Sequence, residues 1–394
     1  MKYKDITQNE IEALKHEYNM SDAHTHQSQS PTQRKIVEKL PALWYESENT
    51  KQFDMEQKFL SNFFRVQKQF SVIEGDNKPL LVYASSIAMV ITANYLMKKN
   101  ITVSLVHPCF DNITDILKHM KVPIEPLEEE WLHDNDKIYE NLVNNVKADA
   151  LFLVDPNNPT GFTLTGSAND MEHTKQGFRE VFRFAKDHKK LLIFDFCFAS
   201  FLLADPKLGI FDIYKEMNDM GVSYIAIEDT GKTWPLQDTK VAMLLASKDL
   251  YDEIYDIHTA YLLNVSPFIL NVVNEYVLDS EKDEFASVYN LLDINRSHAI
   301  DILKGSLLEP LDSMTKVSVL WCRIRHKNIR ATALKEYLTK FDVHVLPGTY
   351  FYWHDRQQGE QFIRIALARN TDIFVKSMKV LRKALDTFEK SLVK

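Results

Sequence analysis

The chain has 394 residues, of which 45% are hydrophobic and 26% are charged, and its formal net charge is −8. This composition is typical of a soluble globular protein, and the length predicts one large and one small core. The negative charge argues against a general nucleic-acid surface, and three cysteines without paired spacing argue against a disulfide framework or a zinc site.

The first segment, residues 1–48, is predicted to contain a helix, a loop and a second helical stretch. Thr7 and Glu10 have the spacing of a capping box. Residues 28–31 interrupt the helical pattern, and residues 35–40 resume it. The polar start shows no secretory signal, and no apolar run is long enough to span a membrane, so we expect a cytoplasmic protein.

Residues 49–280 alternate short apolar runs with stretches of helical period. The runs are 101–106, 150–154, 190–194 and 224–228, and the helical stretches include 86–98 and 111–119. This alternation predicts an α/β fold with a mostly parallel, doubly wound sheet. Residues 281–394 begin with a long polar helix. The candidate strands 316–324, 343–346 and 361–367 follow, and a terminal helix is expected at 374–392. This pattern predicts a smaller α+β domain.

Three motifs follow apolar runs of the larger region. They are residues 155–161 (DPNNPTG) with Asn158, Asp195 at the end of LLIFD, and Lys232 within 227–235 (IEDTGKTWP). Open parallel sheets bind ligands beyond the carboxyl ends of their strands. Pyridoxal phosphate (PLP) needs a lysine that forms a Schiff base, a carboxylate beside its pyridinium nitrogen and a donor, here an asparagine, to its phenolic oxygen. Alone, Asp195 could be a helix cap and Asn158 a turn residue; with Lys232, we favour the cofactor roles.

The order of these motifs resembles the fold-type I aminotransferase superfamily. By position in that superfamily, Ser85, Ser86, Thr230 and Lys240 are expected to bind the phosphate and Phe110 to stack on the ring. A helix beginning at the two serines would favour an anion, although such serines are often only caps and Phe110 could be a core residue. Phe198 stands where the superfamily has a tyrosine, which removes one expected donor.

Arg364 lies inside an apolar candidate strand, where a charge is costly unless it is paired. Its planar fork suits a carboxylate, and it matches the position that binds the substrate α-carboxylate in the superfamily. We interpret Arg369 as its surface counterpart.

Three further motifs narrow the resemblance. The motifs are residues 7–10 (TQNE) with 22–27 (DAHTHQ), residues 107–112 (HPCFDN) and residues 227–235. With them, the chain resembles the PLP- and O₂-dependent L-arginine oxidases and hydroxylases of bacteria. Those enzymes belong to antibiotic and related natural-product pathways, such as those to enduracididine, azomycin and indolmycin. The resemblance spans nearly the whole chain. It implies that the N-terminal helix is a lid, that Thr7, Glu10 and Asp229 face the substrate guanidinium, and that His24 donates a proton or positions water.

The resemblance also implies a reaction. Lys232 would remove the Cα proton of L-arginine, and the resulting quinonoid would reduce O₂ to peroxide, which gives dehydroarginine or (4-hydroxy-)2-ketoarginine. A homodimer and a downstream pathway reductase are the implied partners, and no metal is expected. Two alternatives remain: an ordinary aminotransferase of a cationic amino acid, for which the PLP set with Arg364 would suffice, and a regulator or scaffold without activity.

Overall fold

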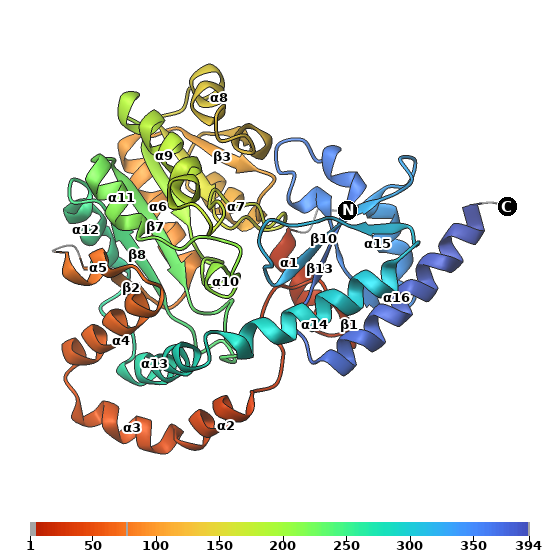
Figure 1. The fold of residues 1–394 in the computed structure, drawn as a ribbon, viewed down its shortest axis with the longest axis horizontal. Coiled ribbons are helices and arrows are strands. Elements are labelled where there is room, and N and C mark those ends of the chain that lie inside the picture. The colour runs from red at the N-terminus through yellow and green to blue at the C-terminus, as the bar shows by residue number, and fades with distance from the viewer. Residues whose placement is uncertain (1–4, 76–77, 393–394) are drawn as a thin grey trace.

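A computed structural model describes residues 5–75 and 78–392, and its largest element is a sheet of seven strands (Figure 1). Their order is β2-β8-β7-β6-β5-β3-β4, and all run in one direction except β8, which is antiparallel to both neighbours. The strands are β2 (Leu80–Val82), β3 (Val103–His107), β4 (Ile124–Glu128), β5 (Ala150–Val154), β6 (Leu191–Asp195), β7 (Tyr224–Asp229) and β8 (Ala242–Ala246). The central strands are buried along their whole length, which explains their continuous apolar runs.

Helices connect these strands and cover the sheet. They are α4 (Gln52–Val66), α5 (Phe70–Glu74), α6 (Ser85–Lys99), α7 (Asp111–His119), η1 (Glu129–Leu132), α8 (Ile138–Asn145), α9 (Met171–Asp187), α10 (Ser200–Leu203), α11 (Ile213–Met220), α12 (Tyr251–Tyr261) and α13 (Pro267–Lys282). Helix α6 begins shortly after β2, and the residue that caps its C-terminus, Asn100, has the left-handed φ of 54°. Its N-terminus therefore opens at the carboxyl edge of the sheet.

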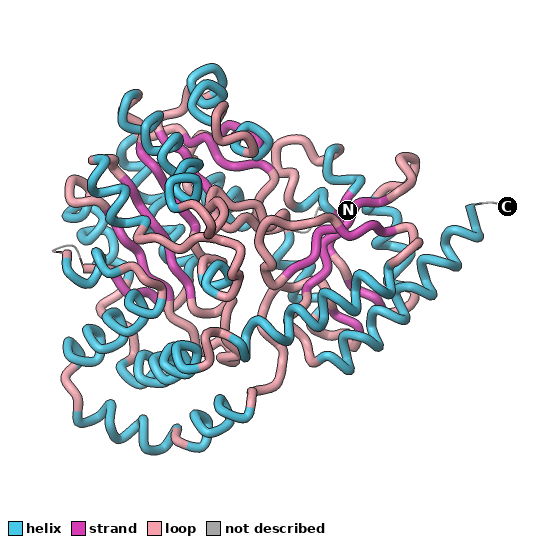
Figure 2. The backbone as a smooth tube through the Cα atoms, viewed as in Figure 1, coloured by secondary structure: helices cyan, strands magenta, loops and turns pink. Residues whose placement is uncertain are grey.

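A second, antiparallel sheet has the order β12-β13-β10-β9. Its strands are β9 (Leu308–Pro310), β10 (Val319–Ile324), β12 (Leu346–Pro347) and β13 (Phe362–Ala366), and the surrounding helices are α14 (Ala286–Leu303), α15 (Ala331–Thr339), η2 (Gly348–Tyr350), η3 (Gln358–Gln361) and α16 (Thr371–Leu392). Helix α14 runs from the region of the main sheet to this smaller sheet (Figures 1 and 2). The α/β fold with a mostly parallel sheet and a smaller α+β part is as predicted.

The N-terminal segment contacts both parts of the molecule. It comprises α1 (Ile6–Ala13), β1 (Tyr18–Asn19), α2 (Pro31–Glu38) and α3 (Leu40–Asn49). Strand β1 pairs in parallel with β11 (Val343–His344), which joins α1 to the smaller sheet's side of the molecule. Helices α2 and α3 then pack against α13.

Two local predictions for this segment are wrong. Thr7 and Glu10 form no capping box, because Asp5 is the N-cap and accepts a hydrogen bond from Gln8 N (2.7 Å). The second helix begins at Pro31, earlier than predicted, since Ser30 caps it and proline suits the first helical position. Among the described residues, no helix has the length and apolar character needed to cross a membrane.

Candidate active site

A cleft of about 990 Å³ lies where β5, β6 and β7 end. Apart from Thr230 and Arg364, every predicted site residue lines it: Thr7, Glu10, His24, Ser85, Ser86, Phe110, Asn158, Asp195, Asp229, Lys232 and Lys240. These residues come from strand ends, from the start of α6 and from α1. The predicted convergence of the motifs at one edge of the sheet is therefore observed.

Asp195 and Lys232 lie at the centre of the cleft. The buried Asp195 carboxylate accepts a hydrogen bond from Cys197 N (3.0 Å). Burial raises the pKa of Asp195, while hydrogen bonding by Cys197 and the charge of Lys232 act to lower it. The Lys232 side chain is half-buried and makes no hydrogen bond or ion pair with the other described residues. The buried Asp195 carboxylate suits the protonated nitrogen of a pyridinium ring, and the Lys232 amine, which has no protein partner among the described residues, suits an aldehyde.

The N-terminus of α6 forms one end of the cleft. Its N-cap, Ala84, offers no side-chain acceptor, so the first backbone N–H groups point toward the cleft end without a side-chain cap, as an anion requires. Ser85 Oγ donates to Asp229 Oδ2 (3.0 Å), and Gly231 N donates to Asp229 Oδ1 (2.7 Å). Asp229 thus ties the loop before Lys232 to this helix start. Each carboxylate oxygen has a second lone pair and can accept another donor.

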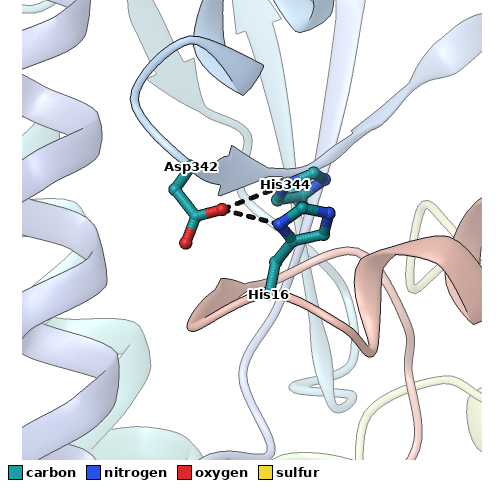
Figure 3. A group of neighbouring side chains, drawn as sticks. All are labelled: His16, Asp342 and His344. Atoms are coloured by element: carbon teal, nitrogen blue, oxygen red, sulfur yellow. Dashed lines mark hydrogen bonds and ion pairs between the residues drawn. The ribbon is translucent and has the colours of Figure 1, made fainter.

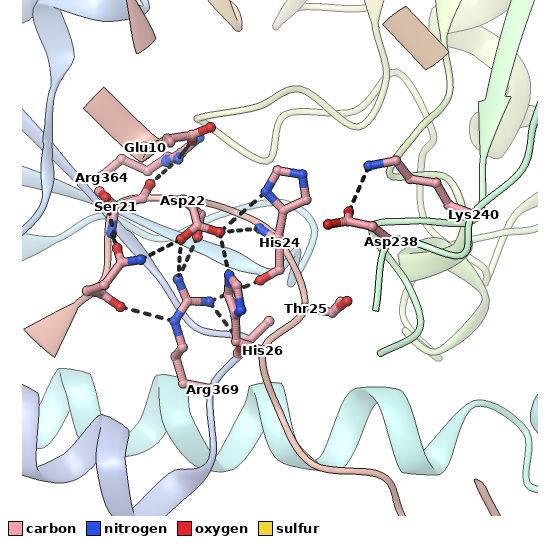
Figure 4. Close-up of polar contacts among 12 residues, drawn as sticks. Glu10, Ser21, Asp22, His24, Thr25, His26, Asp238, Lys240, Arg364 and Arg369 are labelled. Carbon is pink, nitrogen blue, oxygen red and sulfur yellow. Dashed lines mark hydrogen bonds and ion pairs between the residues drawn. The ribbon is translucent and has the colours of Figure 1, made fainter. Parts of the chain in front are cut away.

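The other two expected phosphate ligands have protein partners. Thr230 does not reach the cleft, because its hydroxyl donates to the carbonyl of Val241 (2.8 Å) and accepts from Val241 N (2.9 Å). Lys240 does line the cleft, and its ammonium lies 3.0 Å from Asp238 Oδ1 (Figure 4). The Asp238 side chain is 77% exposed, so this ion pair is screened and leaves Lys240 able to turn toward an anion.

Arg364 is fully buried on β13 and has three partners. Its Nη2 donates to Glu10 Oε1 (2.9 Å) and to the carbonyl of Ser21 (Figure 4). Its Nη1 donates to Asn158 Oδ1 (3.2 Å). Burial lowers the pKa of Arg364, and the Glu10 carboxylate opposes that effect. The residues expected to bind opposite ends of a substrate therefore bind each other. The Asn158 amide N–H₂ remains available to a cofactor oxygen.

His24 belongs to a network centred on the buried Asp22, in which the side chains of His24 and His26 are 38% and 39% exposed. Asp22 Oδ1 lies 3.3 Å from His24 Nδ1 and 2.8 Å from His26 Nε2, and its Oδ2 accepts from Arg369 Nη2 (3.1 Å; Figure 4). Burial acts to raise the pKa of Asp22, but hydrogen bonds from both histidines and the charge of Arg369 hold it far below its usual range. Asp22 thereby fixes the orientation of His24 at the cleft.

Our interpretation of Arg369 as a surface residue is wrong. Its side chain is only 8% exposed, and it donates to the carbonyls of Asn19, Asp22 and His24 at 2.8–3.0 Å. In the sequence, these partners are 345–350 residues away from Arg369. The only sequence signal was an arginine placed directly after an apolar strand.

Helix α1 closes one side of the cleft. Ile6 is fully buried in an apolar cluster with Trp321, Leu346, Tyr350 and Phe351, and its N–H donates to Asp111 Oδ2 (3.1 Å). Packing against Phe351 and its neighbours places Thr7 and Glu10 on the cleft side, where both line the cavity.

Sequence reasoning missed several cleft residues, among them Met89, Asn112 and Cys197. Cys197, one of the three cysteines without paired spacing, lies between Asp195 and Phe198 on the cleft wall. Burial raises the pKa of its thiol well above the ordinary value, so it is protonated at neutral pH. Met89 and Asn112 carry no chemistry that would have marked them.

The comparisons with known proteins agree with this geometry. Residues 47–377 match the family described as aminotransferase class I and II. The chain belongs to this family. Its predicted nature as a PLP-dependent enzyme on an aminotransferase fold is thereby confirmed.

Among solved structures, the family member MppP, soaked with the product 2-ketoarginine, is 31% identical with a TM-score of 0.83; the match covers 93% of this chain and 99% of MppP. Histidinol-phosphate aminotransferase from Clostridium acetobutylicum shares the fold at 16% identity and a TM-score of 0.69, over 93% of this chain and 99% of that one. The α-aminoadipate aminotransferase LysN from Thermus thermophilus also shares the fold, at 13% identity and a TM-score of 0.76. That match covers 97% of this chain and 95% of LysN. No curated protein matches the chain.

Proposed function

We propose that the protein is a PLP-dependent oxidase of L-arginine that uses O₂ as electron acceptor. The products would be dehydroarginine or (4-hydroxy-)2-ketoarginine, with peroxide as the reduced form of O₂. The observation that carries the proposal is the buried Glu10–Arg364 ion pair beside the cleft, because arginine offers the same two charges. Similarity to MppP, whose product is named as 2-ketoarginine, supports this substrate.

The cleft residues divide the work around the cofactor. PLP, when bound, supplies an electron sink for the pair released at the substrate α-carbon. The Lys232 amine would anchor the cofactor and then accept the Cα proton as general base. Asp195 would keep a proton on the ring nitrogen, Asn158 would donate to the phenolic oxygen, and the α6 N-terminus with Ser85 and Ser86 would hold the phosphate.

Arginine would bind by exchange of ion-pair partners. In the free protein, Arg364 and Glu10 satisfy each other, which avoids two isolated buried charges. The substrate α-carboxylate would take the place of Glu10 on the Arg364 fork, and the substrate guanidinium would take the place of Arg364 on Glu10. The two new pairs preserve charge neutrality, and Thr7 and Asp229 lie in the same cleft as further acceptors.

Helix α1 and His24 would control water and protons. Because Ile6 fixes α1 against the smaller sheet, the closed helix limits access of bulk water, and exclusion of water shapes the fate of reactive intermediates. His24, held by Asp22, could deliver a proton to reduced oxygen or hold one water.

The test is turnover of L-arginine by the pure, PLP-loaded protein without any keto acid. We expect O₂ consumption, peroxide and keto acid to appear together, and all three to vanish anaerobically and in Lys232→Ala. Turnover only after addition of a keto-acid acceptor would instead establish an ordinary aminotransferase of a cationic amino acid. Inertness under both conditions with PLP bound would indicate a scaffold.

A further inference from the structure

A cluster of two histidines and an aspartate lies away from the cleft, where α1 leads into β1. His16 follows α1, and Asp342 and His344 flank Val343 of β11 (Figure 3). The β1–β11 pairing, with Tyr18 opposite Val343, brings these two distant segments together. One donor atom from each side chain lies within 4.8 Å of the others.

The distances around Asp342 are close to those of a metal centre. Asp342 Oδ1 lies 2.7 Å from His16 Nδ1 and 3.8 Å from His344 Nε2. Tetrahedral zinc, with bonds of about 2.0–2.1 Å, holds its donor atoms about 3.3 Å apart. The two imidazole rings are stacked with centroids 3.9 Å apart, so one must turn for both lone pairs to meet a single ion. His16 is 33% exposed and has room for that rotation.

A second observation points to a missing partner. His344 is only 12% exposed, and its buried Nε2 makes no hydrogen bond among the described residues, because the Asp342 carboxylate oxygen that faces it is 3.8 Å away. Buried polar atoms are normally satisfied, and one that is not calls for an unplaced water or ion. Asp342 is 43% exposed, so an ion could enter from solvent and keep water as a further ligand.

We propose that His16, Asp342 and His344 bind a divalent cation of the zinc class. Two imidazoles and one carboxylate are a donor set for zinc and its first-row neighbours, whereas Mg²⁺ prefers oxygen ligands. Glu17 N donates to Asp342 Oδ2 (3.3 Å), and the Glu17 carboxylate is paired with Lys376 (2.6 Å). Lys335, the other nearby cation, donates to Asn9 Oδ1 (2.6 Å).

Binding at this position clamps helix α1 to the smaller sheet's side of the molecule. The ion links the residue that leads out of α1 to β11, and α1 carries Thr7 and Glu10 on the cleft wall. A cross-link of this kind reduces the freedom of the open helix and thus favours its closed position. The inference concerns α1 itself and does not depend on the reaction that the cleft catalyses.

The test is calorimetric titration of the chelator-treated full-length protein with Zn²⁺, with Mg²⁺ as the negative probe. We expect one Zn²⁺ per chain, and a loss of affinity of at least about tenfold in His16→Asn and in His344→Asn, since even outer-shell changes have effects of this size. His298→Asn, an exposed histidine of α14, is the matched control and should bind as the wild type does.

Two measurements on the wild type keep the test independent of variant folding. Co²⁺ should give the visible absorption of a site with nitrogen ligands, and Zn²⁺ should slow amide exchange in residues 6–13. Equal Zn²⁺ affinity in the wild type and His16→Asn, or unchanged exchange in α1, overturns the proposal.

Discussion

At the scale of single residues, the charged side chains at and beside the cleft form ion pairs with one another. Arg364 is paired with Glu10, Arg369 with Asp22, and Lys240 with Asp238. The first two pairs are buried, where removal of one partner is far more costly than at a surface. They differ in position, because Glu10 lines the cleft whereas Asp22 and Arg369 do not, so the proposed substrate exchange concerns the Glu10–Arg364 pair.

Glu10→Gln tests this exchange. The amide keeps the shape of Glu10 but cannot neutralise a guanidinium, and a hydrogen bond to a charged group contributes about 1.5–3 kcal/mol. We expect kcat/KM for L-arginine to fall roughly 10- to 100-fold. The kcat/KM for norleucine should not fall, because norleucine lacks the guanidinium and its carboxylate no longer has to displace the Glu10 carboxylate from Arg364. Glu12→Gln, on the exposed side of the same helix, is the matched control. Equal losses for both substrates would contradict a guanidinium contact.

Asp22→Asn tests the network around His24. With Arg369 left without its carboxylate, we expect the free energy of unfolding to fall by about 3 kcal/mol near neutral pH. The native pKa of Asp22 is depressed, so its stabilisation is fully present above the unfolded value and is lost as pH falls below it. The difference between wild type and variant should therefore be constant at neutral pH and shrink below about pH 4.

Urea unfolding at several pH values measures this difference. Asp134→Asn, which breaks a surface ion pair with Lys137, is the comparison and should have little effect at any pH. A difference that grows toward low pH would contradict the assignment.

At the scale of elements, the sequence predicted what local patterns encode. Strands β5, β6 and β7 were recognisable because central parallel strands are apolar throughout, and the residues that follow them form the cleft. Strand β4 was not, since it is an edge strand that carries Glu125, Pro126 and Glu128.

Contacts between distant segments could not be predicted from periodicity. The pairs Glu10–Arg364 and Asp22–Arg369 join the N-terminal segment to the last strand and to the loop that follows it. The residues around each partner do not indicate which distant residue it pairs with. Resemblance to a family supplied the role of Glu10, but the pairing itself required the structure.

Ile6→Ala tests whether α1 is a closed lid. Deleting part of a buried aliphatic side chain costs about 2–5 kcal/mol, and we expect most of this loss in local closure because Ile6 packs in a separate small cluster. Amide exchange in residues 6–13 should quicken and KM for L-arginine should rise, with the main unfolding transition nearly unchanged. Ile11→Ala, at a position 56% exposed on the same helix, should alter neither quantity.

At the scale of the whole molecule, buried carboxyl groups link stability to pH. Burial raises the pKa of Asp111 to about 8, of Asp155 to about 7 and of Glu228 to about 8. Each group keeps a proton in the native state that the unfolded chain releases at lower pH. Over this window these three groups bind more protons in the native state than in the unfolded chain, so their contribution to the free energy of unfolding decreases as pH rises from about 5 to about 8.

Glu228→Gln isolates one contribution to that slope. Glu228 is a buried residue of β7, and its Oε1 accepts a hydrogen bond from Tyr214 (2.8 Å), which a glutamine carbonyl can also accept. Because the amide has no proton to lose, the variant should match the wild type near pH 5 and become progressively more stable than it toward pH 8, by up to about 1.4 kcal/mol for each pH unit. Urea unfolding at fixed PLP concentration from about pH 5 to pH 8.5 measures the slope. Glu253→Gln, at the surface beside Lys99 (2.7 Å), should leave it unchanged, and parallel slopes for wild type and Glu228→Gln would mean that Glu228 is already ionised in the folded protein.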